Sequence, residues 1–292
     1  MKNFSPTIFL NLTVERLTME DHGKLKVIDF HTHLFPDAVA GKAVAKLVDS
    51  AMAVPHTDGT AKGLYNSAID AGINKCLVMP VLTSPKQFDS VNKFASEINR
   101  GSFSDILLSF GGIHPDCDDL EGKIAYLKDC GFKGLKIHPE FQQTDIDDKK
   151  YLQIAEAAEK YGLILLTHAG YDASFPSDRH CTPEKLKKFI KNSSCSKLVL
   201  AHLGGLQSWL QVMDFICGEN VCLDTAHIFP YIDDKLFSLI AEQHGTDKIL
   251  FATDSPWKDQ KEYIAKIKSF KFSEIIEKQI FYENAARLLN LS

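Results

Sequence analysis

Short apolar runs alternate with longer amphipathic stretches along the chain from residue 25 onward. The runs are continuously apolar, as expected of strands in a parallel sheet that is covered on both faces. After the first interval, each run begins roughly 24 to 34 residues after its predecessor, which is the length of one strand–helix unit. We predict eight strands, at Lys26–Phe30, Lys75–Met79, Ile106–Phe110, Gly134–Ile137, Leu163–Thr167, Lys197–Ala201, Val221–Asp224 and Lys248–Ala252.

Helices are expected between these strands, for example at Lys149–Tyr161, Thr182–Asn192 and Ile232–His244. In the second of these, Thr182 is a natural N-cap and Pro183 suits the first helical position. The first interval spans about 50 residues, longer than one strand–helix unit needs. We therefore expect an inserted loop there, around residues 54–59.

Eight strand–helix units in 292 residues predict a (β/α)8 TIM barrel. The alternative is a doubly wound open sheet, which would usually carry a glycine-rich phosphate loop after its first strand. Here the first strand is followed by the residues HTHLFP, which favours the barrel. We expect one barrel domain over 25–292, preceded by a short N-terminal extension over 1–24. The extension lacks a small-residue cleavage site, so we do not expect a signal peptide.

Composition narrows the class of protein. The chain is 45% hydrophobic and 24% charged, which is ordinary for a soluble globular enzyme. Its formal net charge of -5 offers no basic field for nucleic acid or an anionic membrane. Its seven cysteines include no CxxC pair, which indicates reduced thiols and a cytoplasmic location. No apolar run approaches the length of a membrane span.

The histidines are placed unevenly. Of 11 in the chain, seven lie at or just past the C-terminal end of a predicted strand, namely His31, His33, His114, His138, His168, His202 and His227. In a barrel this end carries the chemistry. Histidines that merely fill a core would show no such preference, so we expect a functional site at this end.

Five strand-end residues have the chemistry of metal ligands. His31 and His33 are two residues apart on a strand, so their side chains point the same way and could grip one divalent cation. His168, His202 and Asp254 close later apolar runs. Three of these four imidazoles together with the carboxylate match the preferences of zinc and leave positions open for water and substrate. Core or surface histidines, and an ordinary helix N-cap at Asp254, are the alternatives; we predict a catalytic metal site.

The same residues carry a family resemblance. The sequence resembles the amidohydrolase superfamily, in particular the amidohydrolase-related branch of metal-dependent hydrolases with a barrel fold. That branch also includes aminocarboxymuconate-semialdehyde decarboxylase and related nonoxidative decarboxylases. The resemblance runs from about Val27 to the end of the chain, through the motifs IDFHTHLFP, GGIHP, GLKIHPEFQ, LLTHAG, LVLAHLGG and FATDSPW.

This resemblance implies roles for single residues. His31, His33, His168 and Asp254 would hold one divalent metal ion, most simply zinc, with manganese or iron as alternatives. His202 would bind a second metal or act on the substrate by polarising its carbonyl. Asp254 would also accept a proton from metal-activated water and pass it to the leaving group.

Lys136 is open to two interpretations. Some two-metal members of the superfamily carbamylate a lysine at this strand, so Lys136 could bridge two metals. The alternative, which we favour together with a single metal, is an unmodified lysine paired with a nearby carboxylate.

Substrate recognition is less strongly indicated. His114 and His138 are expected to line the pocket. Arg179 lies in a loop at the catalytic end and could grip a substrate carboxylate, although a solvated loop arginine is an equal alternative. The expected partner is a small-molecule substrate, and a homodimer is compatible with the sequence.

Three functions remain open from the sequence. The leading prediction is a hydrolase that uses metal-activated water on an amide, ester or lactone bond. The alternative is a metal-dependent nonoxidative decarboxylase of an aromatic or unsaturated carboxylic acid. A barrel that binds a metal or small ligand without turnover is the third.

Overall fold

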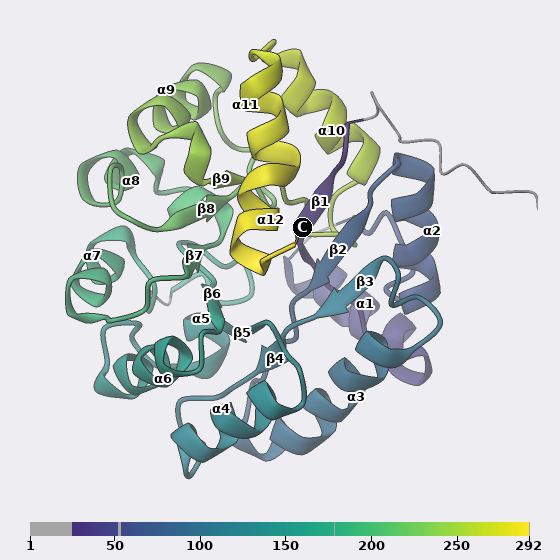
Figure 1. Cartoon of the computed structure of the whole chain (residues 1–292), viewed down its shortest axis with the longest axis vertical. Coiled ribbons are helices and arrows are strands. Elements are labelled where there is room, and N and C mark those ends of the chain that lie inside the picture. Colours follow the sequence, from purple (N-terminus) through teal and green to yellow (C-terminus); the bar gives the residue numbers. More distant parts are fainter. Residues whose placement is uncertain (1–24, 52–53, 178, 292) are drawn as a thin grey trace, which may run out of the picture.

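A computed structural model describes residues 25–291 except 52, 53 and 178. The N-terminal extension expected over 1–24 lies outside the described residues. The described residues form a parallel β-barrel surrounded by helices, which confirms the predicted fold (Figure 1).

The barrel strands are arranged in chain order, each parallel to its neighbours. A single residue, Phe110, separates β3 from β4, so the two act as one strand of the barrel and the total is the predicted eight. The strands are β1 (Ile28–Thr32), β2 (Lys75–Val78), β3 (Leu107–Ser109), β4 (Gly111–Gly112), β5 (Gly134–Ile137), β6 (Ile164–Thr167), β7 (Leu198–Leu200), β8 (Cys222–Asp224) and β9 (Ile249–Leu250).

Backbone hydrogen bonds close the barrel between its first and last strands. The Phe30 amide donates to the Phe251 carbonyl over 2.9 Å, and the Asp254 amide donates to the His31 carbonyl over 2.8 Å. One residue pair further along, the His33 amide donates to the Ser255 carbonyl over 2.6 Å. This closure brings the HTH motif, which follows the first strand, and Asp254, which follows the last strand, to the same rim of the barrel.

Helices cover the outside of the barrel (Figure 1). The long first interval holds two helices, and the loop predicted at 54–59 connects them. Thr182 caps α7 as predicted, since its hydroxyl accepts from the Lys185 amide over 3.3 Å. The helices are α1 (Asp37–Ala51), α2 (Ala61–Ala71), α3 (Phe88–Arg100), α4 (Leu120–Asp129), α5 (Pro139–Gln142), α6 (Lys149–Lys160), α7 (Pro183–Asn192), α8 (Trp209–Phe215), α9 (Asp234–His244), α10 (Gln260–Ser269), α11 (Glu274–Lys278) and α12 (Asn284–Leu289). Short 3-10 or π turns lie at Pro85–Gln87, His202–Gly204, Thr246–Lys248 and Gln279–Glu283.

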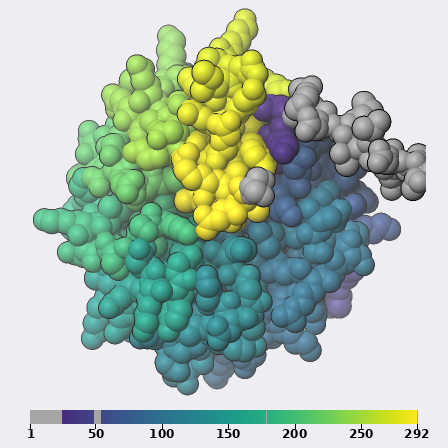
Figure 2. All heavy atoms as spheres, viewed as in Figure 1, coloured from purple at the N-terminus to yellow at the C-terminus, as the bar shows by residue number. Residues whose placement is uncertain are grey.

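The C-terminal helices close the end of the barrel where the strands begin. Ala285, Ala286 and Leu289 of α12 pack into the apolar cluster that fills the barrel interior. The Asn284 amide donates to the carbonyls of Thr246 and Ile249, each over 2.8 Å, at the start of β9. Figures 1 and 2 show this segment lying across the face of the molecule, in yellow. The opposite end is therefore the one available for a site.

No helix within the described part of the chain is both long enough and apolar enough to span a bilayer. All seven cysteines lie in that part and none of them forms a disulfide.

Candidate metal centre at the barrel mouth

His31, His33 and Asp254 converge at the mouth of the barrel. The Nε2 atoms of the two histidines lie 3.2 Å apart. Asp254 Oδ1 lies 3.1 Å from His33 Nε2 and 3.6 Å from His31 Nε2. Ligand atoms around a tetrahedral ion with bonds of about 2.1 Å lie about 3.4 Å apart, so this spacing suits one cation. These three residues form one of two groups in the described chain whose donor atoms are close enough to share a metal ion.

The partners behind the two imidazoles fix which ring nitrogen carries the proton. His31 Nδ1 donates to Asp224 Oδ2 over 2.9 Å, and His33 Nδ1 donates to the Met79 carbonyl over 2.8 Å. In each neutral ring the Nε2 atom is then left with a bare lone pair. Two lone pairs and a carboxylate that face one another repel unless a cation lies between them. The residues present therefore fit a divalent metal.

An irregularity in β1 aims His31 at this point. Ile28 and Phe30 belong to the cluster that fills the barrel interior, so strict alternation would send His31 outward. The pairing of β1 with β2 shifts register between Asp29 and Thr32. His31 is thereby turned inward, where its Nε2 lies 3.2 Å from the Lys136 amine. Irregular strand pairing of this kind commonly redirects side chains beside active sites.

His168 and His202 form a second pair beside the first group. His168 Nδ1 lies 3.1 Å from His202 Nε2, while His202 Nδ1 donates to the Ala226 carbonyl over 2.9 Å. His202 Nε2 therefore carries a lone pair. Burial lowers the pKa of His202 to about 4 and that of His168 well below its usual value, so both rings are neutral at pH 7. This pair could also hold a cation.

Lys136 is fully buried between these groups, on β5. Burial lowers the pKa of its amine to about 8, although the negative charges of Asp224 and Asp254 act in the opposite direction. The predicted pairing with a nearby carboxylate is not a direct contact: the atom that Lys136 meets is His31 Nε2. Its place beside both histidine pairs keeps the bridging role open.

Asp254 is ionised at neutral pH. Burial would raise its pKa, but its contacts with His227 and His33 hold that pKa well below the usual range. Its two oxygens are divided: Oδ1 faces the histidine pair and Oδ2 lies 3.2 Å from His227 Nδ1. Asp254 can therefore serve as an anionic ligand or as a base.

The second group of donor atoms comprises His138, His168 and Asp172. His138 caps α5, its Nδ1 accepting from the Phe141 amide over 3.4 Å. The proton of the neutral ring is then on Nε2, which lies 3.5 Å from Asp172 Oδ2. This tautomer makes His138 a donor to Asp172, so the group fits a cation less well than the first.

Two predicted substrate-binding residues, His114 and Arg179, make hydrogen bonds within their own loops. His114 is buried and its Nδ1 accepts from the Asp116 amide over 3.1 Å, within its own loop. Arg179 is exposed, donates to the Pro176 carbonyl over 2.9 Å and lies over the Tyr171 ring. Their roles in substrate binding stay predictions.

The sequence indicated no role for Asp224 or His227 and did not point to Asp172. Asp224 closes the predicted strand Val221–Asp224 just as Asp254 follows another, so a signal for it was present. His227 has a φ of 60°, and His202 and Asp254 have φ of 56° and 70°. Such left-handed backbone is uncommon for residues other than glycine and concentrates at functional sites.

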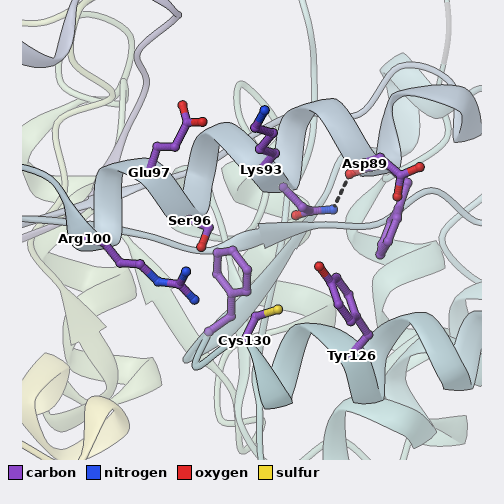
Figure 3. A pocket seen from close by; sticks show the side chains of 10 residues that line it. Asp89, Lys93, Ser96, Glu97, Arg100, Tyr126 and Cys130 are labelled. Carbon is purple, nitrogen blue, oxygen red and sulfur yellow. Dashed lines mark hydrogen bonds between the residues drawn. The ribbon is translucent and has the colours of Figure 1, made fainter.

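A surface hollow of about 720 Å³ lies elsewhere, on the outside of the barrel between α3 and α4 (Figure 3). Its lining includes Asn92, whose amide donates to the Phe88 carbonyl over 2.8 Å, together with Arg100 and Tyr126. None of the predicted site residues lines it, so it is separate from the barrel mouth.

Comparison with known proteins assigns the chain to a family. A model of the Amidohydrolase family matches residues 109–291, more than half of the sequence. The chain belongs to the amidohydrolase family. No curated protein matches this amidohydrolase in sequence.

Solved structures share its fold. An uncharacterized TIM-barrel protein from Bordetella bronchiseptica is 15% identical, with a TM-score of 0.72 over 91% of this chain and 99% of that one. A 2,6-dihydroxybenzoate decarboxylase from Rhizobium is 16% identical, with a TM-score of 0.68 over 92% and 99% of the two chains. A 5-carboxyvanillate decarboxylase from Novosphingobium aromaticivorans, solved with bound manganese, is 14% identical, with a TM-score of 0.68 over 93% and 98%.

The amidohydrolase is thus an enzyme of this superfamily, and the residues at its barrel mouth are able to hold a divalent metal ion. Which residues hold the ion, and whether it is zinc, stay predictions.

Proposed function

We propose that this amidohydrolase is a metal-dependent carboxy-lyase, which removes carbon dioxide from an aromatic or unsaturated carboxylic acid without oxidation. The observation that carries the proposal is the convergence of His31, His33 and Asp254 beside the buried amine of Lys136. This site offers two positively charged groups, a divalent metal ion and the Lys136 ammonium, to the oxygens of one acidic substrate. Decarboxylases of aromatic acids among the similar solved structures support the same reaction class.

The chain's own residues can move the proton that this reaction requires. A divalent ion held by His31, His33 and Asp254 would draw electrons from the substrate oxygens. When the bond to the carboxyl group breaks, its electron pair stays on the substrate carbon and carbon dioxide leaves. Lys136, with a pKa of about 8, carries a proton at neutral pH and could deliver it to that carbon. Solvent then returns the proton to Lys136.

Hydrolysis of an amide, ester or lactone is the second candidate function. It is favoured by the His168–His202 pair, whose nitrogens lie 3.1 Å apart and could hold a second cation. Lys136 would then bridge the two ions as a carbamate. Asp254, ionised at neutral pH, would accept the proton of the attacking water, and His202 would polarise the scissile carbonyl.

The two functions are separated by assaying one metal-loaded preparation in both ways. The protein is stripped with a chelator, reloaded with manganese or zinc, and its metal content is measured. We expect it to release carbon dioxide from hydroxybenzoates or unsaturated acids, and His33→Ala to lower kcat/KM more than about 100-fold because a metal ligand is lost. His56→Ala, which removes an exposed imidazole, is the control.

Hydrolysis of an amide, ester or lactone panel without any release of carbon dioxide would overturn the carboxy-lyase proposal. Two bound ions for each chain together with that result would support the hydrolase.

A further inference from the structure

Lys258 is a half-buried cation that has no anionic partner among the described residues. It lies in the loop between β9 and α10, and among the described residues no carboxylate comes within ion-pair distance of its amine. Neighbouring lysines on α10 differ: Lys261 pairs with Asp70 on α2, and Lys266 pairs with Asp234 on α9 over 2.7 Å. A cation that has lost part of its water normally acquires a partner.

A chain of contacts joins Lys258 to the metal-ligand group. Its Nζ lies 5.7 Å from the centroid of the Tyr231 ring, within the range of a cation–π contact. The Tyr231 ring is stacked on His227 with centroids 5.6 Å apart and an interplanar angle of 17°. His227 Nδ1 in turn lies 3.2 Å from Asp254 Oδ2. Lys258 is thus a second positive point on the rim, away from Lys136 at the base of the site.

The carboxylates of Asp254 and Glu262 act on Lys258 at a distance, and neither forms an ion pair with it. Burial lowers the pKa of its amine, while the negative charges of Asp254 and Glu262 act in the opposite direction. Asp254 is the nearer to the chemistry, but its oxygens already face His33 and His227. Tyr231 is half-exposed, which keeps this part of the rim accessible from solvent.

We propose that Lys258 binds a second anionic group of the substrate, so that the substrate is a dicarboxylate. This inference rests on the proposed carboxy-lyase function: one carboxylate reacts beside His31, His33 and Lys136, and the other pairs with Lys258. It assigns the role of carboxylate anchor to a lysine of the β9–α10 loop instead of Arg179. The Arg179 guanidinium already donates to Pro176 and lies over Tyr171, in the loop after β6.

Binding, measured apart from turnover, tests this assignment. The manganese-loaded protein is titrated in a calorimeter with benzoate and with the ortho, meta and para benzenedicarboxylates. We expect at least one dicarboxylate to bind more than about 10-fold tighter than benzoate, the difference that one well-placed ion pair can supply. Lys258→Met should abolish that preference and leave benzoate affinity within about 2-fold, while Lys258→Arg should restore it.

Lys261→Met is the matched control, since it removes a cation three residues further along that is already paired with Asp70. Thermal unfolding of each variant shows whether the fold is retained. The inference is overturned if wild type has no preference for any dicarboxylate, if the preference survives Lys258→Met, or if Arg179→Met is the variant that abolishes it. Failure of the carboxy-lyase proposal is a separate result: no carbon dioxide is released, whatever the Lys258 dependence of binding.

Discussion

Asp224 and the Met79 carbonyl orient the two predicted histidine ligands from the side of each ring opposite Nε2. Each accepts the Nδ1 proton of one histidine and so directs the Nε2 lone pair toward the other. Asp224 has a further task, because its Oδ1 accepts from the amides of His202 and Ala226 over 2.8 and 3.0 Å. A single buried carboxylate therefore orients both a predicted metal ligand and the backbone that carries His202.

Replacing Asp224 with asparagine should weaken metal binding. The asparagine oxygen would stay with the two backbone amides, and its NH2 group would face His31 Nδ1. That arrangement moves the imidazole proton to Nε2 and removes the lone pair. We expect metal affinity to fall about 10- to 100-fold, as measured by competition with a chelating dye.

Asp116→Asn, which changes a surface carboxylate paired with Lys150, is the control for this substitution. Unchanged metal affinity in Asp224→Asn would show that the His31 tautomer does not depend on Asp224.

The residue scale also shows which signals the sequence lacked. The spacing of His31 and His33 predicted that they share a direction, and their Nε2 atoms do meet. Nothing in the sequence indicated the left-handed backbone of His202, His227 and Asp254, since such strain is tolerated only where tertiary contacts impose it.

At the scale of elements, the loops after β6 and β7 are joined just beyond the histidines they carry. Gly170 and Leu206 form an isolated parallel bridge. The Gly170 backbone has a φ of 89°, and a side chain there would meet the Leu206 amide nitrogen at 2.1 Å. This close approach holds His168 and His202 at a constant separation.

Gly170→Ala should therefore destabilise the protein strongly. Left-handed alanine costs about 1–2 kcal/mol, and displacement of the Leu206 backbone adds to it. We expect a total loss of more than about 3 kcal/mol, or a fall in Tm of at least about 6 °C, in calorimetry.

Gly72→Ala separates the two effects. Gly72 ends α2 with a φ of 72°, but a side chain there would meet no atom within 4 Å. Only the conformational cost should appear, about 1–2 kcal/mol. Equal losses in the two variants would mean that the contact with Leu206 adds nothing.

At the scale of the whole molecule, a buried carboxyl group lies at the seam that closes the barrel. Asp29 of β1 accepts from the hydroxyl and amide of Thr253 over 2.6 and 3.0 Å, and from the Gln260 amide over 2.8 Å. Burial raises the pKa of Asp29 to about 7 despite these hydrogen bonds. The first strand, the segment after the last strand and α10 thus meet at one titratable group.

This seam should make stability depend on pH. Because the pKa of Asp29 in the folded state lies above the ordinary aspartate value of 3.8, folding is favoured most when the group is protonated. Its contribution is lost as pH rises from about 4 to about 7. Between pH 5 and pH 8 we expect the metal-free wild type to lose about 2–3 kcal/mol relative to Asp29→Asn.

Urea unfolding of both proteins at the two pH values measures this difference. An equal pH dependence in wild type and Asp29→Asn would mean that Asp29 titrates in the folded state as it does in the unfolded chain. Comparing the two slopes removes the contribution of every other titrating group.

The sequence by itself determined the barrel and most of the candidate ligands, because both follow from local pattern. A run of apolar residues makes a buried strand, and a polar residue after each run reaches the same rim once the strands lie parallel. The sequence did not predict the two helices of the first interval or the split of the third strand, because the limits of these elements depend on packing against distant neighbours.

Only the tertiary structure decided how those residues act. The register shift in β1 turns His31 inward, and Asp224 and Met79 set the imidazole protons. Within the part of the chain that the structure describes, Lys258 has no carboxylate partner, whereas Arg179 donates to a carbonyl of its own loop. The partners that orient the two histidines lie far away in the chain, 193 positions from His31 for Asp224 and 46 positions from His33 for Met79. Side-chain spacing along one strand carries no information about such contacts, so only the folded molecule determines the chemistry of the rim.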